Sequence, residues 1–182
     1  MLEQTNEIVR RFNSLVGREV LTECQPILSD TGRLPGIDGK AKMSKSLGNT
    51  IELGMSSDEI KQAVFAMYTD PGHLRVSDPG RVEGNIVFAY LDAFHPDKAL
   101  VAEMKAHYQR GGLGDIRCKQ VLNDCLQTLL APMRERRQAA IADKDSLLAL
   151  LYQGTEQARL LTGEVLAEVK GALGLDYFAR LR

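Results

Sequence analysis

The sequence predicts a mostly α-helical protein, in which the end of an α/β domain (residues 1–53) precedes an all-helical bundle (residues 54–182). Two observations support this division. The chain opens with one helical pattern, two short apolar stretches and a glycine-rich loop, and after residue 56 apolar residues recur at helical spacing. With 44% hydrophobic and 26% charged residues, the chain has enough apolar side chains for a core and the charge of an ordinary globular protein.

The first element is expected to be a helix over residues 6–16, capped by Thr5, with Ile8 and Phe12 on its apolar face. Residues 19–21 and 26–28 are apolar stretches that are short enough for strands. A helix that is followed by short strands is typical of an α/β layer.

Residues 29–50 are expected to form a long loop, because glycine and proline interrupt the segment repeatedly and it shows little apolar periodicity. Long loops inside compact proteins are often functional. This loop is therefore the first place to look for chemistry.

The helical region begins with a capping-box pattern, Ser56 and Glu59. Asp-Pro-Gly occurs twice, at residues 70–72 and 78–80, and we interpret both copies as turns rather than as a catalytic duplication. A proline inside a helix and a glycine between two helical patterns should each interrupt the structure: Pro132 is expected to kink or split its helix, and Gly154 to separate two. The helices are expected over residues 84–94, 98–108 with Asp97 as cap, 115–142, 144–153 and 155–173.

The net charge, the cysteines and the lack of long apolar runs argue against several classes of protein. The net charge of −1 provides no overall basic field, so a nonspecific RNA or DNA binder is disfavoured and any RNA site must be a local patch. Cys24, Cys118 and Cys125 show no disulfide or metal-site spacing and are interpreted as small core residues. The start lacks a signal pattern and no apolar run reaches the roughly 20 residues of a membrane span, so we expect a cytoplasmic protein that does not enter the membrane.

The informative segment is Lys42-Met43-Ser44-Lys45-Ser46. It places two ammonium groups beside small hydroxyls on a glycine-rich loop, a combination that suits a polyphosphate. Such a loop could stabilise charge that develops on a leaving pyrophosphate. By composition alone, a solvated lysine-rich surface loop is the alternative.

The five-residue string resembles the second signature of class I aminoacyl-tRNA synthetases, and its position before a helical region is similar to that family. Further stretches resemble the tryptophanyl group, with a tyrosyl type as the alternative: residues 2–13, 35–40, 49–51, 67–71 and 108–119. The resemblance implies that residues 1–53 end a Rossmann-like nucleotide-binding domain and that residues 54–182 form the tRNA (anticodon)-binding domain.

The resemblance also implies an activity and its substrates. The family uses ATP, with Mg²⁺, to activate tryptophan as an adenylate, and it then loads tRNA(Trp); its members are homodimers. Lys42 and Lys45 would be the catalytic residues that contact the phosphates, and Lys45 is the more important candidate. Met43, Ser44 and Ser46 would shape the nucleotide-binding loop, and the backbone near Leu34 would lie by the adenine. No protein metal site is expected.

Candidate tRNA-contacting residues are basic side chains of the helical region, namely Lys119, Arg134, Arg136 and Arg137. Their contacts with phosphates would depend on salt concentration. The alternative is a solvated helix face, because residues 134–137 wind around the helix instead of lining one side of it. Arg180 and Arg182 form a further basic cluster at the end of the chain.

One departure from the family is large, because the first signature and the Gly-x-Asp-Gln segment are both absent. We therefore expect a fragment, a truncated product or a split partner that is inactive alone. Two alternatives stay open. One is a non-catalytic helical tRNA-binding module, and the other is a different small polyphosphate binder, which is disfavoured because no Gly-x-x-x-x-Gly-Lys-Ser loop occurs.

Overall fold

A computed structural model describes residues 1–29, 31–40 and 42–177. These residues form two compact units, one made of Met1–Ser29 with the segment from Asp143 onward, and the other of the stretch between them. Helices dominate both, and the described residues contain only one isolated β-bridge and no strand. The predicted mostly α fold is confirmed, whereas the domain boundary after residue 53 stays a prediction.

Helix α1, Leu2–Val16, begins four residues earlier than expected. Thr5 does not cap it. The Thr5 hydroxyl lies one turn inside the helix and donates to the carbonyl of Met1, 3.2 Å away. The helix ends at Gly17, whose φ of 69° is the left-handed conformation that glycine adopts at little cost.

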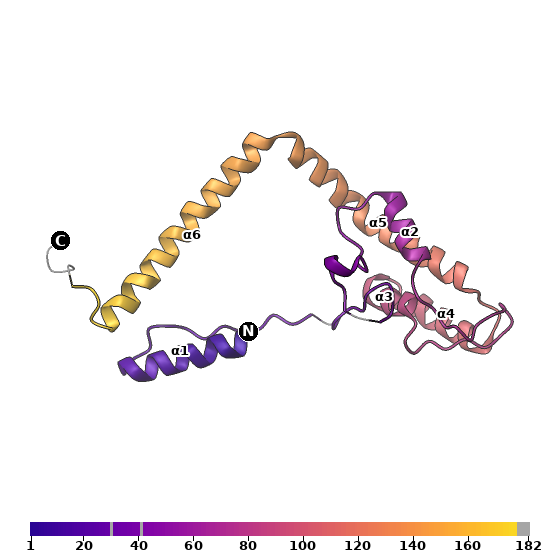
Figure 1. Ribbon diagram of the computed structural model, residues 1–182, viewed down its shortest axis with the longest axis horizontal. Coiled ribbons are helices and arrows are strands. Elements are labelled where there is room, and N and C mark those ends of the chain that lie inside the picture. Colours follow the sequence, from indigo (N-terminus) through magenta and orange to yellow (C-terminus); the bar gives the residue numbers. More distant parts are fainter. Residues whose placement is uncertain (30, 41, 178–182) are drawn as a thin grey trace. The chain divides into compact units, whose positions relative to one another are not determined.

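Two asparagines hold the chain after α1 in an extended path along the helix (Figure 1). Asn13 Oδ1 accepts from the N–H of Leu21, 3.0 Å away, and its Nδ2 donates to the Leu21 carbonyl at 2.7 Å. Asn6 makes the same pair of bonds with Cys24, at 2.7 and 2.9 Å. The distance between the two asparagines matches the distance between their partners. Seven helical residues rise about 10.5 Å, and three extended residues span about 10 Å. The two predicted strands have no ladder partner among the described residues.

Helix α6, Lys144–Ala172, is continuous through Gly154, so the predicted break there was wrong. Its start is fixed by Asp143, whose carboxylate accepts from the N–H of Ser146 at 3.0 Å. A single interior glycine costs only about 1 kcal/mol relative to alanine, which does not end a helix of this length. Over its whole described length, α6 buries no residue.

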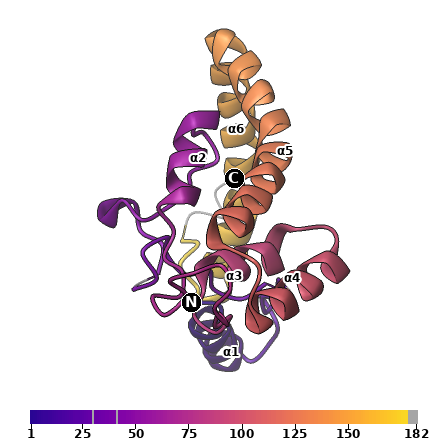
Figure 2. The ribbon, with the colours of Figure 1, turned by 90° about the vertical axis from the view of Figure 1, so that its right-hand side faces the viewer.

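The second unit packs four helices around one core: α2 (Ser57–Phe65), α3 (Ile86–Phe94), α4 (Lys98–Arg110) and α5 (Asp115–Ala142). Helix α5 contacts α2 and α3, and α3 also contacts α4 (Figures 1 and 2). The apolar residues that fill the core are 0–7% exposed: Ile60, Val64, Met67, Ile86, Val87, Phe88, Tyr90, Leu91, Val101, Met104, Tyr108, Cys118, Leu122, Leu126 and Leu130.

Local signals placed most of these helix ends correctly. The capping box of Ser56 and Glu59 is present, and Asp97 caps α4 by accepting from the N–H of Leu100 at 2.9 Å. Pro132 was predicted to kink or split its helix. It lies inside α5, which is continuous from Asp115 to Ala142, so the helix is not split.

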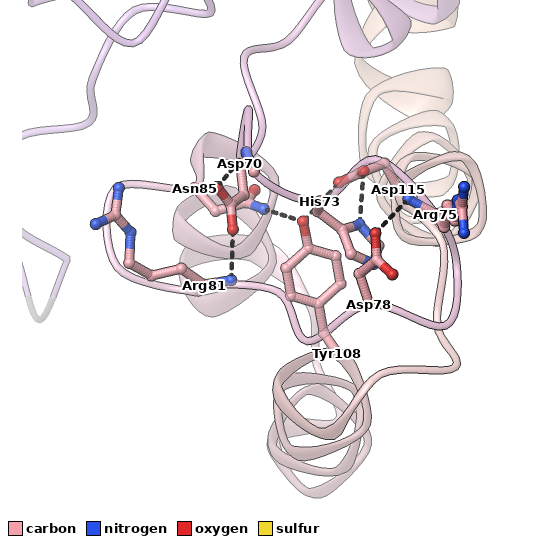
Figure 3. Close-up of polar contacts among 9 residues, drawn as sticks. Asp70, His73, Arg75, Asp78, Arg81, Asn85, Tyr108 and Asp115 are labelled. Carbon is pink, nitrogen blue, oxygen red and sulfur yellow. Dashed lines mark hydrogen bonds and ion pairs between the residues drawn. The ribbon is translucent and has the colours of Figure 1, made fainter.

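A buried polar cluster joins the loop before α3 to α4 and α5 (Figure 3). Asp115 accepts from the Tyr108 hydroxyl at 2.8 Å and from Nδ1 of His73 at 3.0 Å. The His73 side chain is only 1% exposed. Burial, followed by the bond to Asp115, raises the pKa of Tyr108, so this phenol stays protonated and keeps donating.

The first Asp-Pro-Gly segment, residues 70–72, is a turn, as predicted, whereas the second, residues 78–80, follows a turn over residues 75–78 that ends at Asp78. The Asp70 carboxylate accepts from the N–H groups of Gly72, at 2.9 Å, and Arg81, at 2.7 Å. These bonds hold the pKa of Asp70 below its usual value. Asp78 accepts from the N–H of Arg75 at 3.0 Å. The aspartates therefore fix backbone geometry.

The candidate phosphate-binding loop

The loop of residues 35–49 folds back on itself, so that its two arms meet. Pro35 and Lys42 form an isolated antiparallel bridge. A single 3₁₀ turn, Lys45–Leu47, follows and ends at Gly48, whose φ is 63°. The turn places Lys45 and Ser46 at the outer end of the loop, where both are exposed.

Asn49 ties the two arms together from inside the loop and is only 3% exposed. Its Oδ1 accepts from the N–H of Ser44 at 2.8 Å. Its Nδ2 donates to the carbonyl of Lys42, at 3.3 Å, and to Oδ1 of Asp38, at 3.2 Å. Its own carbonyl accepts from the N–H of Ile37 at 3.0 Å. One buried amide therefore fixes the backbone around the two lysines.

The close approach of Asn49 explains the glycine at position 36. A Cβ on Gly36 would lie 2.2 Å from Nδ2 of Asn49 and 2.8 Å from Oδ1 of Asp38. Only a residue without a side chain leaves room for the amide.

The base of the loop is attached to the helical core. The Tyr90 hydroxyl of α3 donates to the carbonyl of Pro35 at 2.9 Å, and burial raises the pKa of Tyr90 to about 12. The N–H of Tyr68 donates to the carbonyl of Ile37 at 2.9 Å. Met43 and Leu34 are partly buried against the same core. The loop thus has a fixed base and an exposed outer end.

The groups at the outer end are available to a ligand. The Lys45 side chain is 81% exposed, and its Nζ lies 3.7 Å from Oε2 of Glu52. Exposed pairs of this kind contribute little, because water screens them. The hydroxyls of Ser44 and Ser46 lie 2.8 Å apart. A polyphosphate could therefore bind the Lys45 ammonium group and both hydroxyls, because only weak existing contacts would be lost.

Two of the predicted nucleotide-binding residues, Leu34 and Lys42, line one surface pocket of about 280 Å³. Arg33 and Lys40 line it as well. Three cationic side chains around one pocket make it attractive to anions. Lys45 is not among the residues that line this pocket.

The predicted tRNA-contacting residues fall into two groups. Lys119 and Arg134 are partly buried and bonded within the unit: Lys119 Nζ donates to the Phe65 carbonyl at 2.8 Å, and Arg134 Nη2 to Oε1 of Gln127 at 3.1 Å. Desolvation lowers the pKa of Lys119.

Arg136 and Arg137 are exposed, and no hydrogen bond or ion pair joins them to the described residues. Their role in tRNA binding stays a prediction. Arg180 and Arg182 lie outside the described residues.

Among the described residues, no group of three or more His, Cys, Asp or Glu side chains could hold a metal ion. No helix in the described part of the chain is both long and apolar enough to cross a membrane.

The family model of class I tRNA synthetases (W and Y) matches residues 1–131, and the chain belongs to that family. The relatives and the structural neighbour described next are tryptophanyl enzymes. It is 51% identical over 180 residues to a tryptophan–tRNA ligase of Clostridium longisporum, covering 98% of this chain and 53% of that ligase. A tryptophan–tRNA ligase of Streptococcus pneumoniae is 50% identical over 183 residues, with 98% and 54% covered.

A solved structure agrees with these sequence relatives. Tryptophanyl-tRNA synthetase from Campylobacter jejuni, complexed with ADP and tryptophan, matches with a TM-score of 0.72 and 26% identity, over 95% of this chain and 53% of that one. The chain therefore spans about half the length of the relatives and the solved structure that it matches.

Proposed function

We propose that this chain supplies the carboxy-terminal half of a tryptophan–tRNA ligase, which activates tryptophan with ATP and transfers it to tRNA(Trp). The single observation that carries the proposal is the loop of residues 42–46, whose two lysines are exposed and whose two serine hydroxyls lie side by side, on a backbone fixed by Asn49. Membership of the synthetase family and the ADP and tryptophan bound by the Campylobacter jejuni relative support it.

Within this proposal, the loop acts on the phosphates of ATP. Lys42, on the cationic pocket, holds the triphosphate, while Lys45 moves with the pyrophosphate as it leaves. Charge that develops on that leaving group is stabilised by donors already in position. Mg²⁺ would be held by the ATP phosphates, and when bound it would screen their charge.

The other predicted roles follow from the same proposal. The adenine lies near the Leu34 backbone. Exposed Arg136 and Arg137 are better placed for tRNA phosphates than Lys119 and Arg134, which are bonded within the unit. The complete enzyme is a cytoplasmic homodimer. The chain alone forms no adenylate, because it spans only half of its relatives.

The test is ATP–pyrophosphate exchange in an enzyme that joins this chain to the part of the Clostridium longisporum ligase that it does not cover. We expect Lys45→Ala to lower the exchange rate tenfold or more, because a lost charge contact in the transition state is worth about 1.4 kcal/mol or above. Lys61→Ala, an exposed lysine on α2, is the control and should change nothing. An unchanged rate in Lys45→Ala would contradict the proposed role of the loop.

A non-catalytic tRNA-binding module is the second candidate, favoured by the predominance of helices. It predicts tRNA binding without adenylate formation in the joined enzyme. Exchange activity in the joined enzyme would exclude it.

A further inference from the structure

The cationic pocket beside the loop carries more positive charge than the five-residue string explains. Its volume is about 280 Å³, and it is lined by Arg33, Leu34, Pro35, Gly39, Lys40 and Lys42. Of its three cationic side chains, only that of Lys42 belongs to the string of residues 42–46. Arg33 and Lys40 lie outside that string, so their place on the pocket needs an explanation of its own.

The fold of the loop brings these cations together. The bridge between Pro35 and Lys42 sets its two arms side by side. The chain turns between the arms at Gly39, whose φ is 69°. A Cβ on Gly39 would lie 3.0–3.2 Å from side-chain atoms of Tyr68, so a side chain here would press on that tyrosine. Cationic side chains from both arms therefore share one pocket on a defined turn.

The positive charge in this pocket is not balanced by the protein. Arg33, Lys40 and Lys42 are exposed, and none of them takes part in the ion pairs of the described residues. Asp38 is the only acidic residue between positions 31 and 51. Its Oδ1 already accepts from Nδ2 of Asn49, at 3.2 Å, and from the N–H of Lys40, at 3.3 Å. Like charges that share a pocket repel one another, and a bound anion relieves that repulsion.

The composition of the pocket favours a nucleoside polyphosphate over a smaller anion. A triphosphate carries more negative charge than a carboxylate or a single phosphate, and it therefore matches three cations better. The guanidinium of Arg33 can bind two phosphate oxygens at once, whereas a lysine acts as a mobile point charge. The side chains of Leu34 and Pro35 add an apolar wall that a base could contact.

We infer that Arg33 and Lys40 hold the triphosphate of ATP before the reaction, whereas Lys45 acts as pyrophosphate leaves. This inference rests on the proposed function and adds two binding residues to it. Lys45 is 81% exposed and does not line the pocket, so the two groups of cations are separate. Contacts that are equally strong in the ground state and the transition state lower KM alone, whereas contacts made only in the transition state raise kcat.

The test is ATP–pyrophosphate exchange in the joined enzyme, measured over a range of ATP concentrations. Arg33→Ala and Lys40→Ala should each raise the KM for ATP about tenfold and leave kcat within twofold, because a lost contact to a charged group weakens binding by about that factor. Lys45→Ala should show the opposite pattern, with a lower kcat and a KM within threefold. Lys40→Arg keeps the charge and should restore the KM to within threefold. Lys61→Ala is the control and should change neither constant.

Direct binding to this chain alone provides a second readout that needs no catalysis. In calorimetric titrations with inorganic tripolyphosphate, we expect binding that weakens as the salt concentration rises, because exposed charges are screened. The double variant Arg33→Ala, Lys40→Ala should weaken binding tenfold or more, and Lys61→Ala should leave it within twofold. Circular dichroism should show the same helix content in all variants, since each changes an exposed side chain.

The inference is overturned if neither substitution raises the KM for ATP, or if both lower kcat without affecting that KM. It is also overturned if the variants raise the KM for tRNA(Trp) in aminoacylation while the KM for ATP stays the same, because the pocket would then serve a phosphate of the tRNA. An active joined enzyme that is insensitive to both substitutions would overturn the inference alone. A joined enzyme that activates no tryptophan, although the chain binds tripolyphosphate through Arg33 and Lys40, would overturn the proposed function and leave the anion site standing.

Discussion

Replacement of Asn49 by alanine should release the loop of residues 42–46 while the helical core stays folded. The substitution removes three side-chain hydrogen bonds, at 2.8, 3.2 and 3.3 Å. Bonds between neutral groups contribute about 1 kcal/mol each and a bond to a carboxylate about 1.5–3 kcal/mol, and these values are not additive. We expect opening of the loop to become easier by about 3 kcal/mol, or roughly a hundredfold.

The assay is amide hydrogen exchange at Ser44, because its N–H is held by the Asn49 side chain. Exchange there should accelerate about a hundredfold in Asn49→Ala, in proportion to the opening equilibrium. Asn13→Ala is the control. It also removes three side-chain bonds, but to residues 20 and 21, so Ser44 should not respond.

A further variant tests separately what the oxygen and the nitrogen of the Asn49 side-chain amide contribute. Asn49→Asp keeps the acceptor for the Ser44 N–H but places a second carboxylate oxygen about where Nδ2 lies, 3.2 Å from Asp38. We expect intermediate loosening at pH 7 and recovery in acid, as the pair gains a proton. If Ser44 exchanges in Asn49→Ala within threefold of its original rate, Asn49 does not hold the loop and the reasoning is refuted.

Three other perturbations test the helical unit. Tyr108→Phe removes the donor to Asp115 and should lower the free energy of unfolding in urea by about 2 kcal/mol; an unchanged midpoint would contradict a structural role. Asp70 has a lowered pKa when folded, so its contribution is present above about pH 4, the unfolded pKa, and is lost as the pH falls. Asp70→Asn should therefore be less stable at pH 7 and lose less stability between pH 5 and 3. Burial raises the pKa of Cys118 to about 12, so iodoacetamide at pH 8 should label exposed Cys24 and leave Cys118 unmodified until urea is added.

Local sequence signals predicted the parts of the fold that are decided locally. The Ser56–Glu59 box and the Asp97 cap need only residues within one helical turn, and both formed as expected. The break predicted at Gly154 was wrong. The small free-energy cost of one glycine in a helix is outweighed by the good helix formers around it.

The candidate site could be predicted only in part. The five loop residues stand out in the sequence, but Asn49 does not, because an asparagine after a glycine is an ordinary turn residue. Its importance comes from contacts across the loop, for example with Asp38, eleven residues away. The position of Lys119 could not be predicted for a similar reason. Its hydrogen bond to the Phe65 carbonyl joins residues 54 apart in the sequence, and the basic residues near Lys119 do not indicate that contact.

The paired asparagines of α1 set a length requirement on that helix. Each residue turns the helix by about 100°. One inserted or deleted residue between Asn6 and Asn13 would therefore rotate one side-chain amide away from the backbone groups with which it forms hydrogen bonds. Point substitutions at the exposed positions between them leave the two amides in phase. In natural variants of this chain, the segment should therefore accumulate exchanges of side chains while its residue count stays constant.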